Sequence, residues 1–417
     1  MDPSRTTKEP LDEILPPAPA AASVRGVTSR ERVLRAINHQ EPDRVPVDLG
    51  GSRPASMYEA VYRKLMAHFG LDVSPDTRFN HRGEVEPFNE RLLELLQVDF
   101  RRVRLRDPNI SSAHVTADGD YVDEWGVTWT KEGPFWSPVG NPLANATMED
   151  LDGYPWPDPL DAGRFEGVET DARRLYEGTG YAVVAAQPVP AYGVFMTCTF
   201  LRGMAQFMVD LAVDKDFARA LMERVLRFHL SIYDRFLSLV GEYVQIVVTS
   251  DDLGTQRAML ISPAMYREMV KPAQARLLSL VKQKTDAKIF YHSCGAIAPV
   301  IPDLIEIGVD ILNPVQPLAE GMESAGLKEA HGGRLVFHGG IDQQQCMTAG
   351  TPEDVALEVG HRIRAFGKGG GYILAVVHNI MPDVPPENVL ALFDAARADG
   401  NYPLDGGSQR PDDVPEQ

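Results

Sequence analysis

Short runs rich in valine and isoleucine recur along this chain, separated by segments that have the length and period of helices. Such runs are typical of buried strands in a parallel sheet. Eight of them are present, at residues 44–50, 98–105, 181–189, 243–252, 287–295, 309–316, 334–342 and 371–379. Eight strands with interleaved helices predict a (β/α)₈ barrel, an α/β fold in which a ring of helices surrounds a closed sheet.

The helices between these runs are clearest in four segments, at residues 29–40, 216–240, 262–284 and 351–367. We expect Ser29 to cap the first of them, and Thr351 to cap the last with Pro352 at its first helical position. Polar, proline-containing stretches at both ends predict disordered tails. The single barrel domain is therefore expected at residues 28–400, between tails at residues 1–27 and 401–417.

Residues 110–160 break this rhythm. Within them, "YVDEWGVTWTK" alternates aromatic and polar residues around Gly126, which predicts a β-hairpin. The hairpin would be an insert after strand two, on the side of the barrel where active sites are built.

Composition limits the partners and the compartment. The formal net charge of −18 repels nucleic acid and anionic membranes, so neither is expected as a partner. Three scattered cysteines suggest free thiols in a reducing compartment. Without a signal-peptide pattern or an apolar stretch of membrane-spanning length, the sequence predicts a cytoplasmic enzyme, and a homodimer is the commonest assembly for one.

Polar side chains gather where the predicted strands end, which is where a barrel of this kind builds its active site. They are Ser250, Asp251 and Asp252 after strand four, His292 and Cys294 after strand five, Asn313 and Gln316 after strand six, His338 and Asp342 after strand seven, and His378 and Asn379 after strand eight. Burial in a parallel sheet does not by itself require such residues, so the carboxyl-terminal mouth is the predicted site.

His292 and Cys294 stand two residues apart, so their side chains share one face of a strand. Imidazole nitrogen and thiolate sulfur are ligands that Zn²⁺ favours, and a catalytic zinc usually has three protein ligands. We expect His378 to be the third. The alternative is that Cys294 is an inert buried thiol and His292 only a hydrogen-bonded side chain.

The other strand-end residues are candidates for catalysis or substrate binding. One of Asp251 and Asp252 is expected to cap the following helix while the other faces the cavity, and both are kept as catalytic candidates. His338 is equally consistent with a core histidine and a substrate contact. The predicted substrate-binding residues are Gln316, His338, Asp342, Asn379 and Arg102.

Arg102 belongs to "FRRVRLRD", in which Arg102, Arg104 and Arg106 alternate along one strand. Three guanidinium groups on one face suit a carboxylate or phosphate of a ligand. The alternative is ion pairing with the acids of the insert at residues 118–124. The glycines at 367–372 precede a strand instead of a helix, so no nucleotide cofactor is predicted.

Several segments together resemble the uroporphyrinogen decarboxylase superfamily: "SRERVLRAINHQEPDRVPVDLGG", "DDLGTQRAMLISPAMYREMVKP", "KIFYHSCGAIAPVIPDLIEIGVDILNPVQP", "FHGGIDQQ" and "GGYILAVVHNIMPDVPPENVLALFDAA". The resemblance spans residues 29–398 and implies a (β/α)₈ barrel. The decarboxylases in it use no metal, and arginines near the first strand hold the substrate. Here "DLGGSRPASMY" offers only Arg53 for that role, and Asp107 lies near the family's assisting aspartate.

The other branch of the superfamily, the corrinoid-dependent methyltransferases, is more similar. The resemblance implies zinc bound through the His-x-Cys and through a cysteine at the end of the last strand, where this chain has His378. The loss of one thiolate makes the metal a stronger Lewis acid and favours an oxygen substrate over a thiol. The expected reaction moves a methyl group from a small methylated substrate, such as a methyl ether, to a corrinoid on a partner protein, or the reverse.

Two alternatives stay open. A cofactor-free decarboxylase of the uroporphyrinogen decarboxylase type predicts a basic, metal-free cavity. A non-catalytic barrel that binds a corrinoid or zinc predicts binding without turnover, although the clustered strand-end polar groups argue against it.

Overall fold

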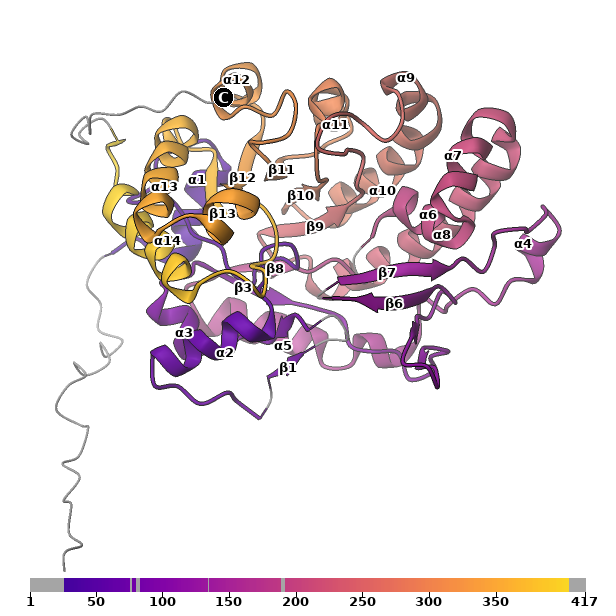
Figure 1. Cartoon of the computed structure of the whole chain (residues 1–417), viewed down its shortest axis with the longest axis horizontal. Coiled ribbons are helices and arrows are strands. Elements are labelled where there is room, and N and C mark those ends of the chain that lie inside the picture. The colour runs from indigo at the N-terminus through magenta and orange to yellow at the C-terminus, as the bar shows by residue number, and fades with distance from the viewer. Residues whose placement is uncertain (1–25, 76, 80–82, 134, 189–191, 405–417) are drawn as a thin grey trace, which may run out of the picture.

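The computed structural model describes residues 26–75, 77–79, 83–133, 135–188 and 192–404. Its main sheet contains seven parallel strands that curl around a common centre (Figure 1). In spatial order these strands are β3 (Phe100–Val103), β8 (Ala182–Ala185), β9 (Ile246–Ser250), β10 (Lys288–His292), β11 (Ile311–Val315), β12 (Val336–Ile341) and β13 (Tyr372–Val376). Each strand lies within one of the predicted apolar runs.

The first predicted strand, at residues 44–50, closes the sheet. Val47 forms a parallel bridge with Leu374 of β13, and on its other side its carbonyl accepts from the Asp99 N–H just before β3. Pro46 has no N–H to donate, which shortens the ladder here to a bridge. The barrel therefore has eight strand positions, and the predicted (β/α)₈ fold is confirmed.

A cluster of buried side chains fills the barrel between the strands, and α1 covers its amino-terminal end. The cluster, which includes two residues of α1, consists of Val33, Ile37, Phe100, Ala182, Val184, Ile246, Val248, Phe290, Ile311, Val336 and Ile373. Because side chains alternate along a strand, residues two positions beyond this cluster also face inward, toward the carboxyl-terminal mouth.

Helices surround the sheet. They are α1 (Ser29–Ile37), α2 (Glu59–His68), α3 (Glu90–Leu95), α5 (Val168–Gly178), α6 (Val194–Arg202), α7 (Met204–Val213), α8 (Lys215–Val240), α10 (Lys271–Lys284), α11 (Ile301–Glu306), α12 (Ser324–His331), α13 (Pro352–Gly367) and α14 (Pro386–Asp399). Shorter elements are β1 (Arg78–Phe79), β2 (Val85–Glu86), α4 (Asp150–Gly153), α9 (Pro263–Met265), and single turns η2 (Ala162–Phe165), η3 (Tyr266–Val270), η4 (Ala298–Val300) and η5 (Gln343–Met347).

The caps of two helices were predicted from sequence. Thr351 caps α13 with Pro352 at its first turn, as expected, and Asp354 completes a capping box. At α1 the cap is Thr28 and not Ser29, because Thr28 forms the reciprocal capping box with Glu31. The freed Ser29 hydroxyl donates to the buried Asp99 carboxylate instead.

The insert after β3 forms an antiparallel sheet of four short strands, so the predicted hairpin is part of a larger unit. These strands are β4 (His114–Val115), β5 (Tyr121–Val122), β6 (Thr128–Glu132) and β7 (Phe135–Gly140). Trp129 of β6 stacks on Tyr192 and packs edge-on against Phe200 of α6. The insert is thereby attached to the segment that follows β8 (Figure 1).

The predicted tails fall mostly outside the described residues. Residues 401–404, which we expected in the carboxyl-terminal tail, are described and contact the barrel: Asn401 bridges to Arg44, and the Tyr402 hydroxyl donates to the Gly367 carbonyl. Within the described ranges, every helix is too short or too polar to cross a membrane.

Candidate metal centre

The site begins at the end of β10. His292 is its last residue and Cys294 follows two positions later, and both continue the inward face that Phe290 begins in the barrel core. Tyr291 points the other way, where its hydroxyl accepts a hydrogen bond from Gln274 of α10. The alternation that the sequence predicted for this stretch is therefore observed.

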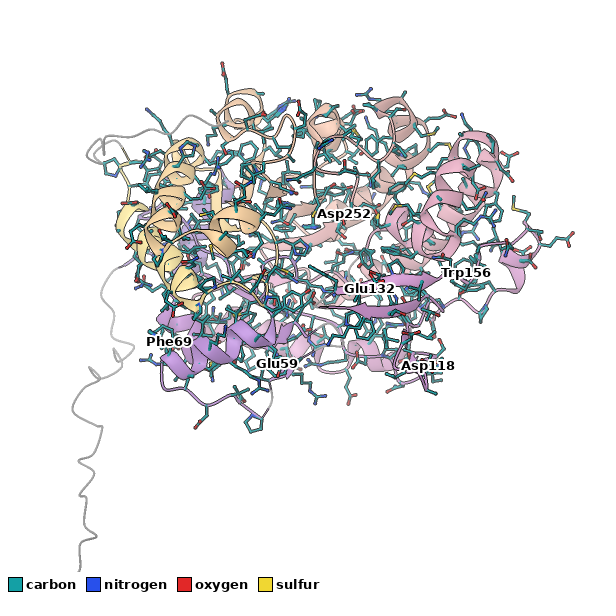
Figure 2. All side chains as sticks on the ribbon, viewed as in Figure 1. Glu59, Phe69, Asp118, Glu132, Trp156 and Asp252 are labelled. Atoms are coloured by element: carbon teal, nitrogen blue, oxygen red, sulfur yellow. The ribbon has the colours of Figure 1, made fainter. Side chains whose placement is uncertain are left out.

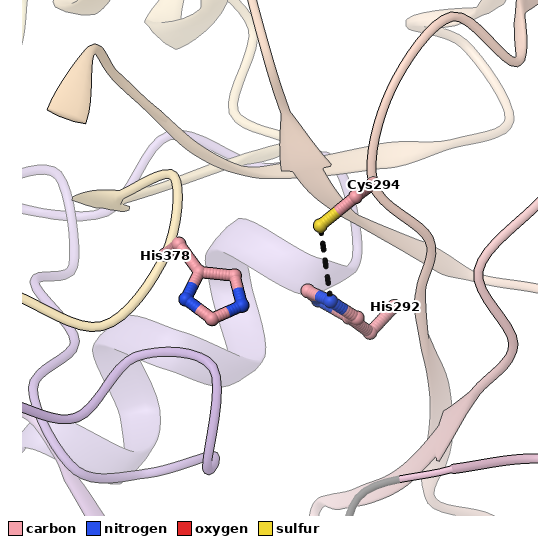
Figure 3. A group of neighbouring side chains, drawn as sticks. All are labelled: His292, Cys294 and His378. Atoms are coloured by element: carbon pink, nitrogen blue, oxygen red, sulfur yellow. Dashed lines mark hydrogen bonds between the residues drawn. The ribbon is translucent and has the colours of Figure 1, made fainter. Parts of the chain in front are cut away.

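The third predicted ligand comes from another strand of the barrel. His378 follows β13, and one donor atom from each of His292, Cys294 and His378 lies within 4.8 Å of the others. Cys294 Sγ is 3.5 Å from His292 Nε2. Figure 3 shows the His378 ring facing the other two side chains across a gap. The centroids of the His378 and His292 rings are 5.8 Å apart.

These three side chains fit zinc. Bond lengths of about 2.0 Å to nitrogen and about 2.3 Å to sulfur put neighbouring ligand atoms of a tetrahedral zinc about 3.5 Å apart. The sulfur and the His292 nitrogen already have this separation, and the 4.8 Å limit on the group leaves His378 within a small adjustment. Two nitrogens and one sulfur leave a fourth position open, as in catalytic zinc sites.

Protonation of the ligands also bears on metal binding. Desolvation in the mouth, together with the nearby His292 ring, lowers the pKa of His378 to about 4, although this residue keeps access to solvent. Burial and the Asp252 carboxylate raise the pKa of the Cys294 thiol well above its ordinary value. A metal ion would therefore find a neutral imidazole at His378 and would have to displace a proton from Cys294.

A chain of buried hydrogen bonds leads away from His292. Its Nδ1 lies 2.5 Å from Asn313 Oδ1, the Asn313 amide nitrogen lies 2.8 Å from His338 Nδ1, and His338 Nε2 lies 3.0 Å from Asp48 Oδ2. Because Nδ1 of His292 is engaged by Asn313, its Nε2 is the nitrogen that faces Cys294.

Of the two readings of His338, this placement favours the core histidine. Its ring is almost fully buried and both nitrogens already have partners in the chain of hydrogen bonds. Asp48 was missed by the sequence analysis, which read polar strand ends only from strand four onward. The same rule applied to "RVPVDLG" would have found it.

Asp252 is the carboxylate that reaches the site. It lies just beyond β9 (Figure 2), accepts a hydrogen bond from the Cys294 N–H at 2.9 Å, and approaches His292 Nε2 to 3.7 Å. Gly295, the residue after Cys294, has φ of +85° and donates its N–H to Gln316 Oε1 at 3.0 Å. Asp252 and Gln316 therefore hold the backbone on either side of the Cys294 sulfur.

Asp251 has a different role. Its two carboxylate oxygens accept from the N–H groups of Phe195 and Met196 at the start of α6, and Gln274 donates to one of them. One member of the pair does cap a helix, as predicted, but the helix is α6. The helix after β9 is capped by Ser262. The geometry thus leaves Asp252 alone as the catalytic candidate of the pair.

Two other predicted substrate contacts are used inside the protein. Asp342 caps η5, accepting from the N–H groups of Gln344, Gln345 and Cys346. Asn379 is buried and donates to Glu84 at 2.9 Å. Both side chains are committed to holding loops of the mouth, because each satisfies buried backbone or carboxylate partners.

The arginine row is ion-paired, as the alternative reading held, but not with the insert acids. Arg102 and Arg104 both lie 3.0 Å from one oxygen of Glu86, and Arg106 pairs with Asp171. Arg102 shares the inward face of β3 with Phe100. It therefore points toward the mouth, where a ligand is expected.

Comparison with known proteins gives a consistent result. The profile of the family described as Uroporphyrinogen decarboxylase (URO-D) matches residues 131–398. A uroporphyrinogen decarboxylase from Psychromonas ingrahamii is 25% identical over 381 residues, covering 88% of this chain and 96% of that protein. One from Pseudomonas fluorescens is 23% identical over 386 residues, with the same coverage of 88% and 96%.

Among solved structures, a methyltransferase from Methanosarcina mazei superposes with a TM-score of 0.61. It is 18% identical in sequence, and the match covers 89% of this chain and 98% of that chain. At this level of identity the likeness concerns the fold.

Proposed function

This chain belongs to the uroporphyrinogen decarboxylase (URO-D) family, and within that family we propose that it is a zinc-dependent methyltransferase that moves a methyl group from a small methyl ether to a corrinoid on a partner protein. The observation that carries the proposal is the convergence of His292, Cys294 and His378 on one point of the mouth. A decarboxylase without a metal has no need of this arrangement.

The ligand set favours an oxygen substrate. Two neutral imidazoles and one thiolate leave more positive charge on a bound metal than one imidazole and two thiolates would. When bound, zinc would supply a Lewis acid for the departing oxygen, and the corrinoid would supply the methyl acceptor. In the reaction the carbon–oxygen bond breaks and the oxygen keeps the electron pair.

The chain's own residues would hold the site in position. Asp252 and Gln316 fix the backbone around Cys294 through the hydrogen bonds at 2.9 and 3.0 Å. Gly295 cannot carry a side chain, since a Cβ atom there would lie 2.5 Å from the Thr255 carbonyl oxygen. A loop held this tightly places the sulfur without further rearrangement.

Arg102 supports a substrate that carries a negative charge. Arg102 and Arg104 share a single Glu86 oxygen, so two positive charges face one negative charge at the mouth. A carboxylate on the substrate would complete the pairing, and guanidinium groups bind carboxylates through paired N–H donors. We therefore expect a methyl ether with a carboxylate to be preferred to one without.

Decarboxylation is the second candidate function, because relatives that cover 88% of this chain are named uroporphyrinogen decarboxylases. Arg53, the residue that the family resemblance offers to hold the substrate in that reaction, is paired with Glu84 at 2.8 Å. Although burial alone would lower the pKa of Arg53, the Glu84 carboxylate holds it above its ordinary value. This pairing weakens the decarboxylase reading.

The test is a methyl-transfer assay with the zinc-loaded full chain, cob(I)alamin as the acceptor, and methoxybenzoate or methoxybenzene as the donor. We expect methylcobalamin to form faster from methoxybenzoate, and Cys294→Ser to abolish its formation. Cys346→Ser is the matched control, since Cys346 is also half-buried but lies outside the metal group. Release of carbon dioxide from uroporphyrinogen by the metal-free chain, unchanged by Cys294→Ser, would favour the decarboxylase instead.

A further inference from the structure

In the buried row of hydrogen bonds from His292 to Asp48, it can be worked out which partner of each bond donates the proton. We propose that Asp48 is a positioning residue that sets the tautomer of His292 from the opposite side of the barrel, through His338 and Asn313. This inference rests on the proposed function, because it concerns a ligand of the proposed metal. It can nevertheless be tested in the metal-free protein.

The direction is fixed at the Asp48 end. Oδ1 of Asp48 accepts from the Gly51 N–H at 2.8 Å, and Oδ2 faces His338 Nε2 at 3.0 Å. A carboxylate can only accept, so a neutral His338 carries its proton on Nε2 and presents a bare Nδ1. That bare nitrogen accepts from the Asn313 amide N–H at 2.8 Å.

The Asn313 amide carries this order of donors and acceptors on to His292, one of the three residues of the candidate metal site. With its nitrogen turned to His338, its oxygen faces His292 Nδ1 at 2.5 Å. A neutral His292 then carries its proton on Nδ1, which leaves the Nε2 lone pair free toward Cys294. This is the tautomer that a metal bound through Nε2 requires.

Burial prevents water from relaxing this order. The exposed fractions of Asp48, His338, Asn313 and His292 are 6%, 1%, 0% and 6%. At Gly51, a Cβ atom would lie 2.5 Å from Asp48 Oδ1 and 2.8 Å from Phe100 Cβ, so the N–H that anchors Asp48 is held close. Each donor therefore needs its present acceptor. The direction of donation can reverse only in all of these hydrogen bonds together.

Asp48→Asn should reverse it. The Gly51 N–H still needs an acceptor, so the new amide oxygen stays with Gly51 and the new amide nitrogen faces His338. His338 then accepts at Nε2 and carries its proton on Nδ1, and Asn313 flips to accept from it. His292 would receive the Asn313 N–H at Nδ1 and carry its own proton on Nε2, where the metal binds.

The experiment reads the protonated nitrogen of each ring by heteronuclear NMR of isotope-labelled histidine in the metal-free full chain. At about pH 8 a free imidazole is neutral. We expect the proton on Nδ1 of His292 and on Nε2 of His338 in the wild type, and the opposite in Asp48→Asn. His292→Ala and His338→Gln assign the two rings. Competition with a chelator should show zinc binding to Asp48→Asn weakened about 10- to 100-fold, the usual effect of losing an outer partner of a metal ligand.

Asp342→Asn is the matched control. Asp342 is as buried as Asp48, with an exposed fraction of 6%, but it caps η5 and makes no hydrogen bond to His292, Asn313, His338 or Asp48. It should leave both tautomers and zinc affinity unchanged. A wild-type His292 protonated on Nε2 would overturn the inference even if no variant folds. Asp48→Asn with wild-type tautomers would overturn it as well. Reversed tautomers in a protein that never binds zinc would uphold the relay and count against the proposed function alone.

Discussion

At the scale of the residue, His229 of α8 is an unusual side chain. It is fully buried, and among the described residues neither of its ring nitrogens has a hydrogen-bond partner. It stacks on Tyr233, with ring centroids 6.5 Å apart, and burial lowers its pKa to about 4. Lowering the pH should therefore destabilise the folded protein in part through this residue.

The direction in which pH changes the free energy of unfolding follows from the difference in the pKa of His229 between the folded and unfolded states. An unfolded histidine takes up a proton near pH 6.5, whereas His229 in the folded chain stays neutral until about pH 4. Its contribution to stability is present above about pH 6.5 and is lost as pH falls toward 4. We expect His229→Leu to remove about 2 kcal/mol of the stability loss between pH 7 and pH 5, measured as the free energy of unfolding in urea. An identical pH dependence in both proteins would contradict this.

The meeting of His292, Cys294 and His378 could be predicted at this scale because alternation along a strand says which side chains share a face. His292 and Cys294 follow from this rule, and His378 follows from the meeting of strand ends at one mouth. The roles of Asp48 and His338 could not be predicted in the same way. Their pairing joins strands that are distant in sequence, and its direction depends on which way the Asn313 amide points.

At the scale of the element, Asp251 shows how a strand end can serve a helix. Both of its oxygens accept backbone N–H groups at the start of α6. Asp251→Asn would turn an amide N–H toward one of these donors. We expect it to lower the free energy of unfolding by about 2 kcal/mol, the cost of a buried unsatisfied donor.

Asp214→Asn is the control for this prediction, read by the same urea titration. Asp214 caps α8 through one oxygen, which accepts from Phe217 N–H, and asparagine caps a helix about as well as aspartate. Equal effects of the two substitutions would show that Asp251 does not need both of its oxygens.

The strands and main helices were predictable because apolar runs and helical periods are local signals. Their ends were less so. The segment at residues 44–50 reads as a strand but pairs with β13 only through the Val47–Leu374 bridge, since Pro46 cannot donate. Thr28 displaced Ser29 as a cap through its pairing with Glu31, and the insert pairs four strands where the sequence indicated one hairpin.

At the scale of the whole molecule, the (β/α)₈ barrel brings residues from eight distant segments to one mouth, and membership of the URO-D family agrees with it. The alternation of Arg102, Arg104 and Arg106 along one strand was visible in the sequence, but the partner Glu86 was not predicted. Glu86 belongs to β2, and only folding brings it to Arg102 and Arg104. The homodimer, the cytoplasmic location and the corrinoid partner stay predictions.

The most direct test of the central claim is the zinc content of the purified full chain, measured by mass spectrometry beside His292→Ala, Cys294→Ser and His378→Ala. Circular dichroism would establish that each variant is folded. We predict about one zinc per wild-type chain, as expected for a site with three protein ligands, and a loss of zinc in all three variants but not in Cys346→Ser. A wild-type chain that stays free of metal after zinc is supplied would contradict the account.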